Sequence, residues 1–275
     1  MTAREAFMQH YPEYLMEAAG LGLFMVSAAV FGTLIWHPSL PLSDSLGVEL
    51  IRLLVMGTAM GLTAIGLIYS PWGKRSGAHL NPAVTLTMMR LRRIAPWDGF
   101  FYIVAQFLGG LAGVLLVSVV ASRVLAAPEL WYVPTVPGHA GTLAALFIET
   151  AMAAGLMAMV LVTGESKKLS SLTGVFAGIF LTTYITLGAP ISGMSINPAR
   201  TIASALPSGM WTAVWIYFVG PLVGMVLVGE IFRRITGKRQ PSCAGMNRHC
   251  VDSCVFKCGS DYWQDRSLHS RGNHS

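Results

Sequence analysis

The sequence predicts an all-α membrane protein of six transmembrane helices and two re-entrant half-helices in an inverted repeat. Three observations carry this prediction. The chain is 53% hydrophobic and 12% charged, with a mean hydropathy of +0.57, which is not the composition of a soluble globular protein. Its apolar length is enough for about six spans of about 20 residues each. One eight-residue pattern, Ser-Gly-x-x-x-Asn-Pro-Ala, occurs twice, beginning at Ser76 and at Ser192.

Each copy of the pattern has the chemistry of a loop that turns into a helix. Asn81 and Asn197 are good N-caps, because the side-chain oxygen of asparagine accepts a backbone N–H of the first turn. Pro82 and Pro198 follow at the first helical position, where the missing N–H of proline costs nothing. The apolar stretch after the first motif is about ten residues long, too short to cross a bilayer, and is predicted to be a re-entrant half-helix.

The predicted spans surround the two motifs in a repeating order. The spans are expected at about residues 14–36, 46–69, 97–120, 142–162, 172–187 and 211–235, with half-helices ending near residues 89 and 206. Each half of the chain therefore runs span, span, half-helix, span, in repeats at about 10–122 and 141–236. Because each repeat holds three spans, an odd number, the second repeat is inverted in the membrane relative to the first.

Basic residues fall on one side of this arrangement, and the other side holds little beyond Arg52 and Arg123. The positive-inside rule therefore predicts a multi-pass protein of the cell membrane with both termini in the cytoplasm. The net charge of +6 follows from these flanks. Nucleic-acid binding is not expected, since no basic, aromatic-interleaved domain lies outside the spans. The basic residues of that side are Arg4, Lys74, Arg75, Arg90, Arg92, Arg93, Lys167, Lys168, Arg233, Arg234, Lys238 and Arg239.

Two half-helices that enter from opposite sides would meet near the membrane midplane. Their N-termini, each with a positive dipole end, would face each other there. Asn81 and Asn197 would offer amide donors at that point, and the preceding loops would present backbone carbonyls. A neutral, hydrogen-bonding solute would find acceptors along one wall and donors at the centre, whereas cations and protons would meet a positive field. The alternative is that the two asparagines are helix caps and nothing more.

The paired Asn-Pro-Ala motifs, the six-span inverted repeat and two matched acids, Glu17 and Glu149, resemble the aquaporin (major intrinsic protein) family over about residues 10–236. The resemblance implies a channel domain at residues 1–240 and a homotetramer in the lipid bilayer with one pore in each subunit. It implies passive conduction of water or small neutral solutes without a cofactor or a metal. The sequence holds no nucleophile–base pairing or phosphate-binding loop, so we do not expect an enzyme.

The resemblance also predicts a selectivity ring. Arg200 follows the second motif, where the family has its filter arginine, and an arginine inside a membrane segment is costly and usually functional. Alignment through the motifs puts Met60, Ile185 and Met194 at the other three positions. Placing Met60 in the ring requires a one-residue insertion in the alignment before the first motif. Gly57 and Gly61 therefore remain open as alternatives at this ring position.

The predicted ring departs from the pattern of water-selective members, which carry an aromatic residue and a histidine at the first two positions. An apolar ring favours solutes with carbon surface or leaves a wider gate. By contrast, Thr201 stands where the glycerol-conducting branch usually has Asp, and the short outer loop at 123–140 resembles the water-channel branch. The predicted function is therefore a passive channel for water and other small neutral solutes, such as glycerol, that excludes ions and protons.

Two acids are expected to support the motif loops, and a histidine is expected to line the pore. A buried carboxylate needs partners. In the fold that the resemblance implies, the nearest free donors to Glu17 and Glu149 are the backbone N–H groups of the motif-bearing loops. The alternative is that both acids lie at the interface in water. His79 resembles the loop histidine of the family, facing the cytoplasmic side of the pore, where its imidazole could titrate near neutral pH.

All four cysteines lie in the polar tail at residues 241–275, which is expected to be partly disordered: Cys243, Cys250, Cys254 and Cys258. A cytoplasmic tail is reducing, so disulfides are disfavoured. Four thiolates could hold zinc or an iron–sulfur cluster, but C-x6-C-x3-C-x3-C is not one of the usual pairs of C-x2-C. We favour an unstructured tail with loose thiols.

Three other functions are compatible with parts of the sequence. One is a small-solute facilitator with little selectivity for water. Another is a coupled secondary transporter, because such proteins also use inverted repeats and broken helices. A third is an interaction or sensing protein in which the tail is the working part and the pore is vestigial.

Overall fold

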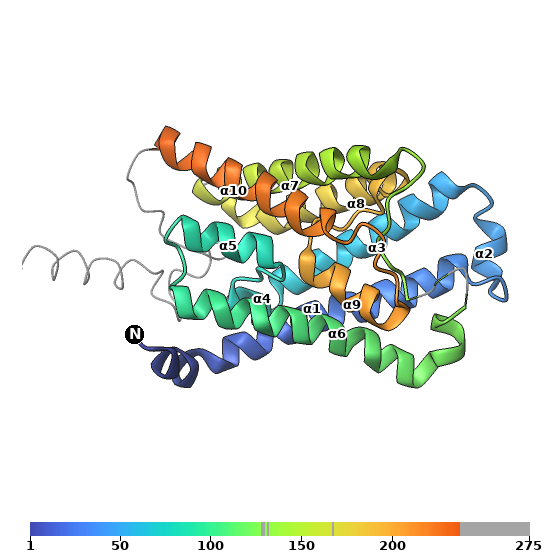
Figure 1. Cartoon of the computed structure of the whole chain (residues 1–275), viewed down its shortest axis with the longest axis horizontal. Coiled ribbons are helices and arrows are strands. Elements are labelled where there is room, and N and C mark those ends of the chain that lie inside the picture. The colour runs from blue at the N-terminus through green and yellow to red at the C-terminus, as the bar shows by residue number, and fades with distance from the viewer. Residues whose placement is uncertain (128–129, 131, 167, 237–275) are drawn as a thin grey trace, which may run out of the picture.

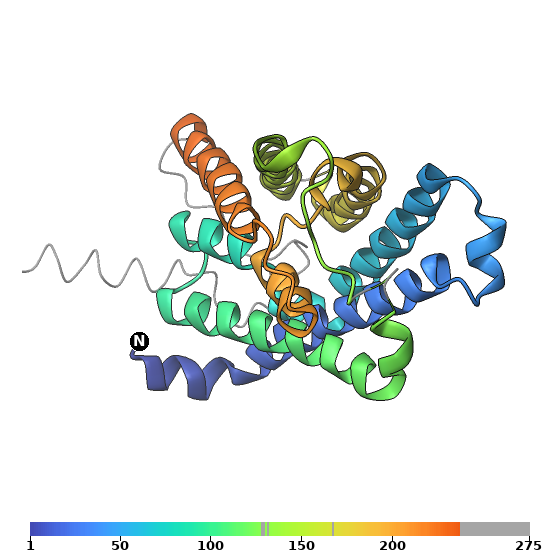
Figure 2. The same ribbon diagram turned by 45° about the vertical axis from the view of Figure 1, so that its right-hand side comes forward.

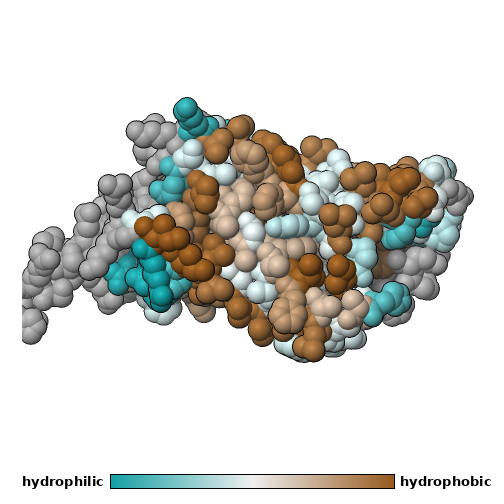
Figure 3. All heavy atoms as spheres, turned by 90° about the horizontal axis from the view of Figure 1, so that it is seen from above, coloured by the Kyte–Doolittle hydropathy of each residue, from teal (hydrophilic) through white to brown (hydrophobic). Residues whose placement is uncertain are grey.

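The computed structural model describes residues 1–236 except 128, 129, 131 and 167, and all regular secondary structure in these residues is helical (Figure 1). Six of its helices are long and apolar enough to cross a membrane, so the chain is a multi-pass membrane protein. They are α1 (Ala3–Trp36), α3 (Glu49–Tyr69), α6 (Pro96–Leu125), α7 (Gly141–Glu165), α8 (Thr173–Ser192) and α10 (Ile216–Thr236). Apolar side chains cover much of the middle of the molecule, and hydrophilic ones appear toward its two ends (Figure 3).

The remaining helices are short, and two of them are the half-helices that the motifs predict. These two are α5 (Pro82–Arg90) and α9 (Pro198–Ser208), and they lie between the long helices, approaching from opposite ends (Figure 1). The others connect the long helices: α2 (Pro41–Ser45), α4 (Pro71–Ser76) and the 3-10 turn η1 (Ser170–Leu172).

The packing of the long helices repeats between the two halves. In the first half α1 packs along α6, and in the second half α7 packs along α10, while α3 and α8 join the halves (Figure 2). Glycines allow the closest approach within each pair. A Cβ on Gly109 would lie 2.1 Å from the carbonyl oxygen of Ala18, and one on Gly224 would lie 2.3 Å from that of Thr150. Only glycine fits at such contacts, as is common between membrane helices.

Several helix boundaries differ from the sequence prediction. Helix α1 begins at Ala3, about eleven residues before the expected start of the first span. Thr2 caps this helix by accepting the backbone N–H of Glu5 at 3.3 Å, and the Glu5 carboxylate accepts the backbone N–H of Thr2 at 2.7 Å. This reciprocal capping box stabilises the start of the helix. The length of the apolar run predicts the span, and it does not detect a polar first turn.

Other boundaries shift by a few residues. The predicted loop after residue 37 contains α2, and α8 continues to Ser192 through Pro190. Helix α10 starts at Ile216, after turns that occupy the beginning of the predicted sixth span. The four tail cysteines lie outside the described residues, so their metal binding stays a prediction. Within the described part of the chain, no group of three or more His, Cys, Asp or Glu side chains has the geometry of a metal site.

Candidate functional site

The asparagine of each motif caps its half-helix. Asn81 Oδ1 accepts the backbone N–H of Ala83 at 2.9 Å. Asn197 Oδ1 accepts those of Ala199 and Arg200 at 3.1 and 3.3 Å. These bonds satisfy donors that the first turn of a helix leaves open.

The amide nitrogens of the same asparagines join the two half-helices to each other. Asn81 Nδ2 donates to the carbonyl oxygen of Ile196 at 2.8 Å, and Asn197 Nδ2 donates to that of Leu80 at 2.8 Å. Each bond crosses from one repeat to the loop of the other, so the N-termini of α5 and α9 meet. An amide nitrogen carries two hydrogens. Each asparagine therefore keeps one N–H beyond its cross-repeat bond, and both residues line the central cavity.

The two motif loops share an unusual backbone conformation. The first loop has positive φ at Ala78 and Leu80, and the second has positive φ at Met194 and Ile196, all between 46° and 51°. A left-handed conformation costs a residue with a side chain roughly 1–2 kcal/mol. The alternation leaves neighbouring N–H groups that need acceptors inside the protein, since no water is available in the bilayer core.

Glu17 supplies those acceptors in the first repeat. Its Oε1 accepts the His79 backbone N–H at 3.0 Å and the Ser76 hydroxyl at 2.8 Å, and its Oε2 accepts the Leu80 backbone N–H at 2.7 Å. Gln106 Nε2 donates to Oε2 as well, at 2.8 Å. The residue is 0% exposed, so the alternative of a carboxylate in interfacial water does not hold.

Glu149 occupies the equivalent place in the second repeat. Its Oε1 accepts the Ser195 backbone N–H at 2.9 Å and the Ser192 hydroxyl at 2.7 Å, and its Oε2 accepts the Ile196 backbone N–H at 2.6 Å. It is also 0% exposed. The donors to both acids are therefore the loop groups expected from the sequence, and each carboxylate stabilises one strained loop through charge-assisted hydrogen bonds.

A tyrosine completes each of these two clusters. Tyr102 donates its hydroxyl to the Ser76 carbonyl at 2.6 Å, and Tyr217 donates to the Ser192 carbonyl at 2.5 Å. The repeats differ four residues further on, where Gln106 in α6 corresponds to Pro221 in α10. The first carboxylate thus has a side-chain amide partner that the sequence of the second repeat does not provide.

A cavity of about 240 Å³ runs past both motif loops, and every residue of the predicted ring lines it. Met60 of α3, Ile185 of α8, Met194 of the second loop and Arg200 of α9 all line it. Gly57 and Gly61 do not. They pack against α8, where a Cβ on either would lie 2.6 Å from a backbone oxygen. Met60 is thus the residue that α3 presents to the cavity at this level.

Arg200 is the strongest charge on the cavity wall. It lies in the first turn of α9, and within the described part of the chain its Nη1 is buried without a hydrogen-bond partner. The Glu149 carboxylate attracts it electrostatically, but accepts its hydrogen bonds from the loop instead. An unpaired donor in an apolar cavity is expensive unless a solute binds it.

His79 also lies on the cavity wall. Its ring is buried, and its Nδ1 is 3.2 Å from the Thr85 hydroxyl oxygen. The second repeat has the same contact in another form, because the Ser195 hydroxyl lies 2.5 Å from the Thr201 hydroxyl. His79 and Ser195 occupy equivalent positions, two residues before the motif asparagine. Each contacts the threonine that lies four residues after that asparagine.

Several lining residues were not found from the sequence. Trp36, the last residue of α1, lines the cavity together with Phe24, and both pack against the buried cluster that includes Met60. The aromatic wall is thus supplied by α1, whereas the predicted ring position on α3 is aliphatic. The outer loop contributes Val133 and Pro134. The available signal was the position of Trp36 at the end of the first apolar run, directly before His37-Pro38.

Comparison with known proteins identifies the family. The chain matches the major intrinsic protein family over residues 8–232. It belongs to this family. It is 33% identical to an aquaporin of Arabidopsis thaliana, NIP4-1, over 71% of this chain and 70% of the relative. It is 31% identical to aquaporin TIP4-4 of Zea mays, over 64% of this chain and 72% of the relative.

A solved structure supports the fold. The aquaglyceroporin from Plasmodium falciparum superimposes on this major intrinsic protein with a TM-score of 0.68. The match covers 82% of this chain and 97% of the other at 18% sequence identity. The inverted repeat of spans and half-helices is therefore the architecture of this chain.

Proposed function

We propose that this major intrinsic protein is a passive channel for water and small neutral solutes, and that the path runs through the cavity between α5 and α9. The single observation that carries this proposal is the meeting of the two half-helix N-termini on the cavity wall. Asn81 and Asn197 are fixed there by their cap and cross-repeat bonds, and each retains an N–H for a passing oxygen. The aquaporin relatives are channels rather than enzymes, and an enzymatic role is not part of the proposal.

Exclusion of ions follows from the same geometry. Two positive helix ends and the Arg200 guanidinium face a cavity whose remaining wall is mostly apolar. A cation would lose hydration there without gaining an acceptor of negative charge, and a positive field is a recognised barrier to protons and cations in pores. A neutral solute meets no such barrier.

The permeants are proposed to include more than water. The side chains of Met60, Ile185 and Met194 carry no hydrogen-bond donor and at most a weakly accepting sulfur, so Arg200 is the main polar group of the ring. Such a ring accommodates a solute with carbon surface on three sides and oxygen toward the arginine. The structural neighbour is named an aquaglyceroporin and the sequence relatives are named aquaporins, which is consistent with either permeant. A facilitator with little selectivity for water is therefore the second candidate.

A coupled transporter is less well supported. Such a protein needs ionisable or ion-coordinating side chains along its path. Among the described residues that line the cavity, the ionisable ones are His79 and Arg200. Neither supplies the carboxylate that commonly couples transport to protons or sodium ions.

The surroundings of the channel are also proposed. The excess of Lys and Arg on one side supports both termini in the cytoplasm, with the chain in the cell membrane. The homotetramer with a pore in every subunit, which the family resemblance implies, is part of the proposal. The roles of the site residues and the division into a channel domain at 1–240 and a tail at 241–275 remain part of this proposal.

The test is osmotic shrinkage of proteoliposomes followed by light scattering, with glycerol and urea gradients run beside a sucrose gradient. Met60→Trp should reduce shrinkage toward the rate of empty vesicles, because an indole at this position fills the ring. Leu62→Trp is the matched control, two residues away on the same helix and 63% exposed on the outer face. Wild-type shrinkage no faster than in empty vesicles would refute the channel, and full conduction by Met60→Trp would refute this path.

A further inference from the structure

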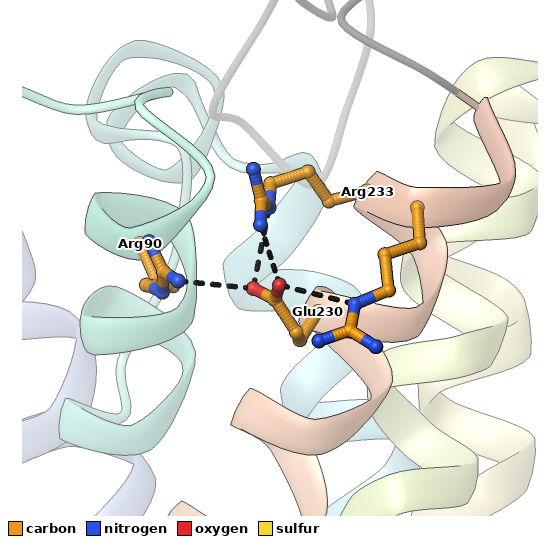
Figure 4. A network of polar contacts seen from close by, with 4 residues as sticks. Arg90, Glu230 and Arg233 are labelled. Atoms are coloured by element: carbon orange, nitrogen blue, oxygen red, sulfur yellow. Dashed lines mark hydrogen bonds and ion pairs between the residues drawn. The ribbon is translucent and has the colours of Figure 1, made fainter.

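A cluster of arginines lies at one end of the helix bundle, away from the cavity. Arg90 is in the last turn of α5, and Arg233 and Arg234 are in the last turn of α10. All three contact the carboxylate of Glu230 (Figure 4). The shortest nitrogen–oxygen distances to Glu230 are 3.2 Å from Arg90 Nη2, 2.5 Å from Arg233 Nη2 and 3.4 Å from Arg234 Nε. We call Arg90, Glu230, Arg233 and Arg234 the arginine cluster.

The arginine cluster has an excess of positive charge and of donors. Three guanidinium groups share one carboxylate, and each guanidinium carries five N–H donors. Glu230 contacts one nitrogen each of Arg90 and Arg234 and two of Arg233. The side chains of the three arginines are 55%, 49% and 76% exposed, in chain order. Within the described residues, Glu230 is the acidic side chain that pairs with these three arginines.

The surface next to the arginine cluster is apolar. On α10 the exposed residues leading to it are Leu227, Ile231 and Ile235, at 56%, 46% and 80% exposure. The helix is apolar enough to span a membrane and ends at Thr236. Exposed aliphatic side chains on a spanning helix face lipid tails, so the arginines of its last turn lie at headgroup depth.

We propose that the arginine cluster binds the phosphate of an anionic phospholipid in the cytoplasmic leaflet. Phosphate oxygens match the planar fork of arginine in geometry as well as in charge. The apolar face of α10 would hold the acyl chains of the same lipid, which a soluble phosphate does not have. The lipid would complete the neutralisation that Glu230 begins.

The tail of the chain itself is a poor alternative ligand for the arginine cluster, because the tail is positively charged. Residues 237–275 contain six basic residues, Lys238, Arg239, Arg248, Lys257, Arg266 and Arg271, and three acidic ones, Asp252, Asp261 and Asp265. A segment with this excess of positive charge is repelled by an arginine cluster and attracted to the same anionic leaflet.

Lipid binding here would act on the half-helix of the first motif. Helix α5 packs closely on α10, because a Cβ on Gly229 would lie 2.8 Å from the Thr87 methyl group. Arg90 reaches from α5 to Glu230 of α10 (Figure 4). A phosphate that contacts arginines of both helices would tie the end of α5 to α10, so anionic lipid should stabilise the full chain against heat.

The experiment measures lipid binding to the purified full chain by native mass spectrometry, with phosphatidylglycerol and phosphatidylcholine of the same acyl chains. The double variant Arg233→Gln/Arg234→Gln should bind phosphatidylglycerol roughly 30-fold more weakly, since each arginine near an anionic surface contributes about a factor of five. Arg233→Lys/Arg234→Lys keeps the charge and should lose less. Arg4→Gln is the matched control, an exposed arginine on α1 outside the cluster.

Thermal unfolding in detergent supplies the second readout. Phosphatidylglycerol should raise the midpoint of the wild type and of Arg4→Gln but not that of the double glutamine variant. The proposal fails if all variants bind the lipid equally, or if phosphatidylcholine binds as well as phosphatidylglycerol. It also fails if inorganic phosphate gives the same stabilisation, or if anionic lipid binds only after residues 241–275 are removed.

Discussion

Replacing Glu149 by glutamine tests whether an ionised carboxylate holds the second motif loop. The carboxylate accepts hydrogen bonds from Ser195 N and Ser192 Oγ on one oxygen and from Ile196 N on the other. In Glu149→Gln one of these oxygens becomes an NH2 group, which faces a backbone N–H. One charge-assisted bond is lost, and the remaining bonds become neutral.

The magnitude follows from these contacts. A hydrogen bond to a charged group contributes about 1.5–3 kcal/mol and a neutral one about 0.5–1.5 kcal/mol. Losing one bond and weakening the others costs about 4 kcal/mol of folding free energy. The neutral glutamine avoids the cost of burying a charge, which offsets part of this loss. We therefore expect the free energy of unfolding to fall by about 2–4 kcal/mol. The loop cannot relax easily, since Met194 and Ile196 depend on these bonds for their positive φ.

Glu17→Gln is the matched comparison. Gln106 lies against Glu17, and in the described part of the chain its Oε1 is buried without a partner. Reversal of the Gln106 amide would give the new NH2 group of residue 17 an acceptor. Because Pro221 stands at the corresponding position of the second repeat, Glu149→Gln has no such repair. We expect Glu17→Gln to be milder by about 1 kcal/mol.

The assay is thermal unfolding in detergent, followed by tryptophan fluorescence. A domain of this size loses about 2–4 °C of Tm for each kcal/mol, so Glu149→Gln should lower Tm by about 5–15 °C and Glu17→Gln by a few degrees less. Osmotic conduction per folded channel should fall with Glu149→Gln, since the same loop carries Met194 and ends at Asn197. A Tm loss under about 2 °C for Glu149→Gln, or a larger loss for Glu17→Gln, would refute the reasoning.

Three further outcomes are expected. Arg200→Ala should raise proton leak into vesicles loaded with a pH-sensitive dye, and an unchanged leak would count against its role in exclusion. Ile185→Ala should speed glycerol uptake relative to water by widening the ring, whereas Ile179→Ala, 54% exposed on the same helix, should change neither rate. Gly193→Ala should cost more than about 2 kcal/mol, because its φ is 76° and its Cβ would lie 2.6 Å from Val136 O. In Gly209→Ala, with φ 69° but open space, the loss should stay near 1 kcal/mol; equal losses would contradict the steric argument.

The sequence by itself determined the features that depend on short-range chemistry. The spans are long apolar runs, and the half-helices begin where Asn81-Pro82 and Asn197-Pro198 provide a cap and a first turn. The need of a buried carboxylate for donors pointed to the motif loops as partners of Glu17. The spans and half-helices use residues within one segment, whereas the partners of Glu17 follow from a rule about burial together with the fold that the family resemblance implies.

The tertiary structure decided which side chains face the cavity. Met60 rather than Gly57 lines it, because α3 turns Gly57 and Gly61 toward α8. The rotation of a mostly apolar helix about its axis is set by its neighbours. Trp36 joins the wall because α1 ends beside the ring, at a point that its own sequence does not specify. The cross-repeat bonds of Asn81 likewise exist only once two segments far apart in the chain are folded against each other.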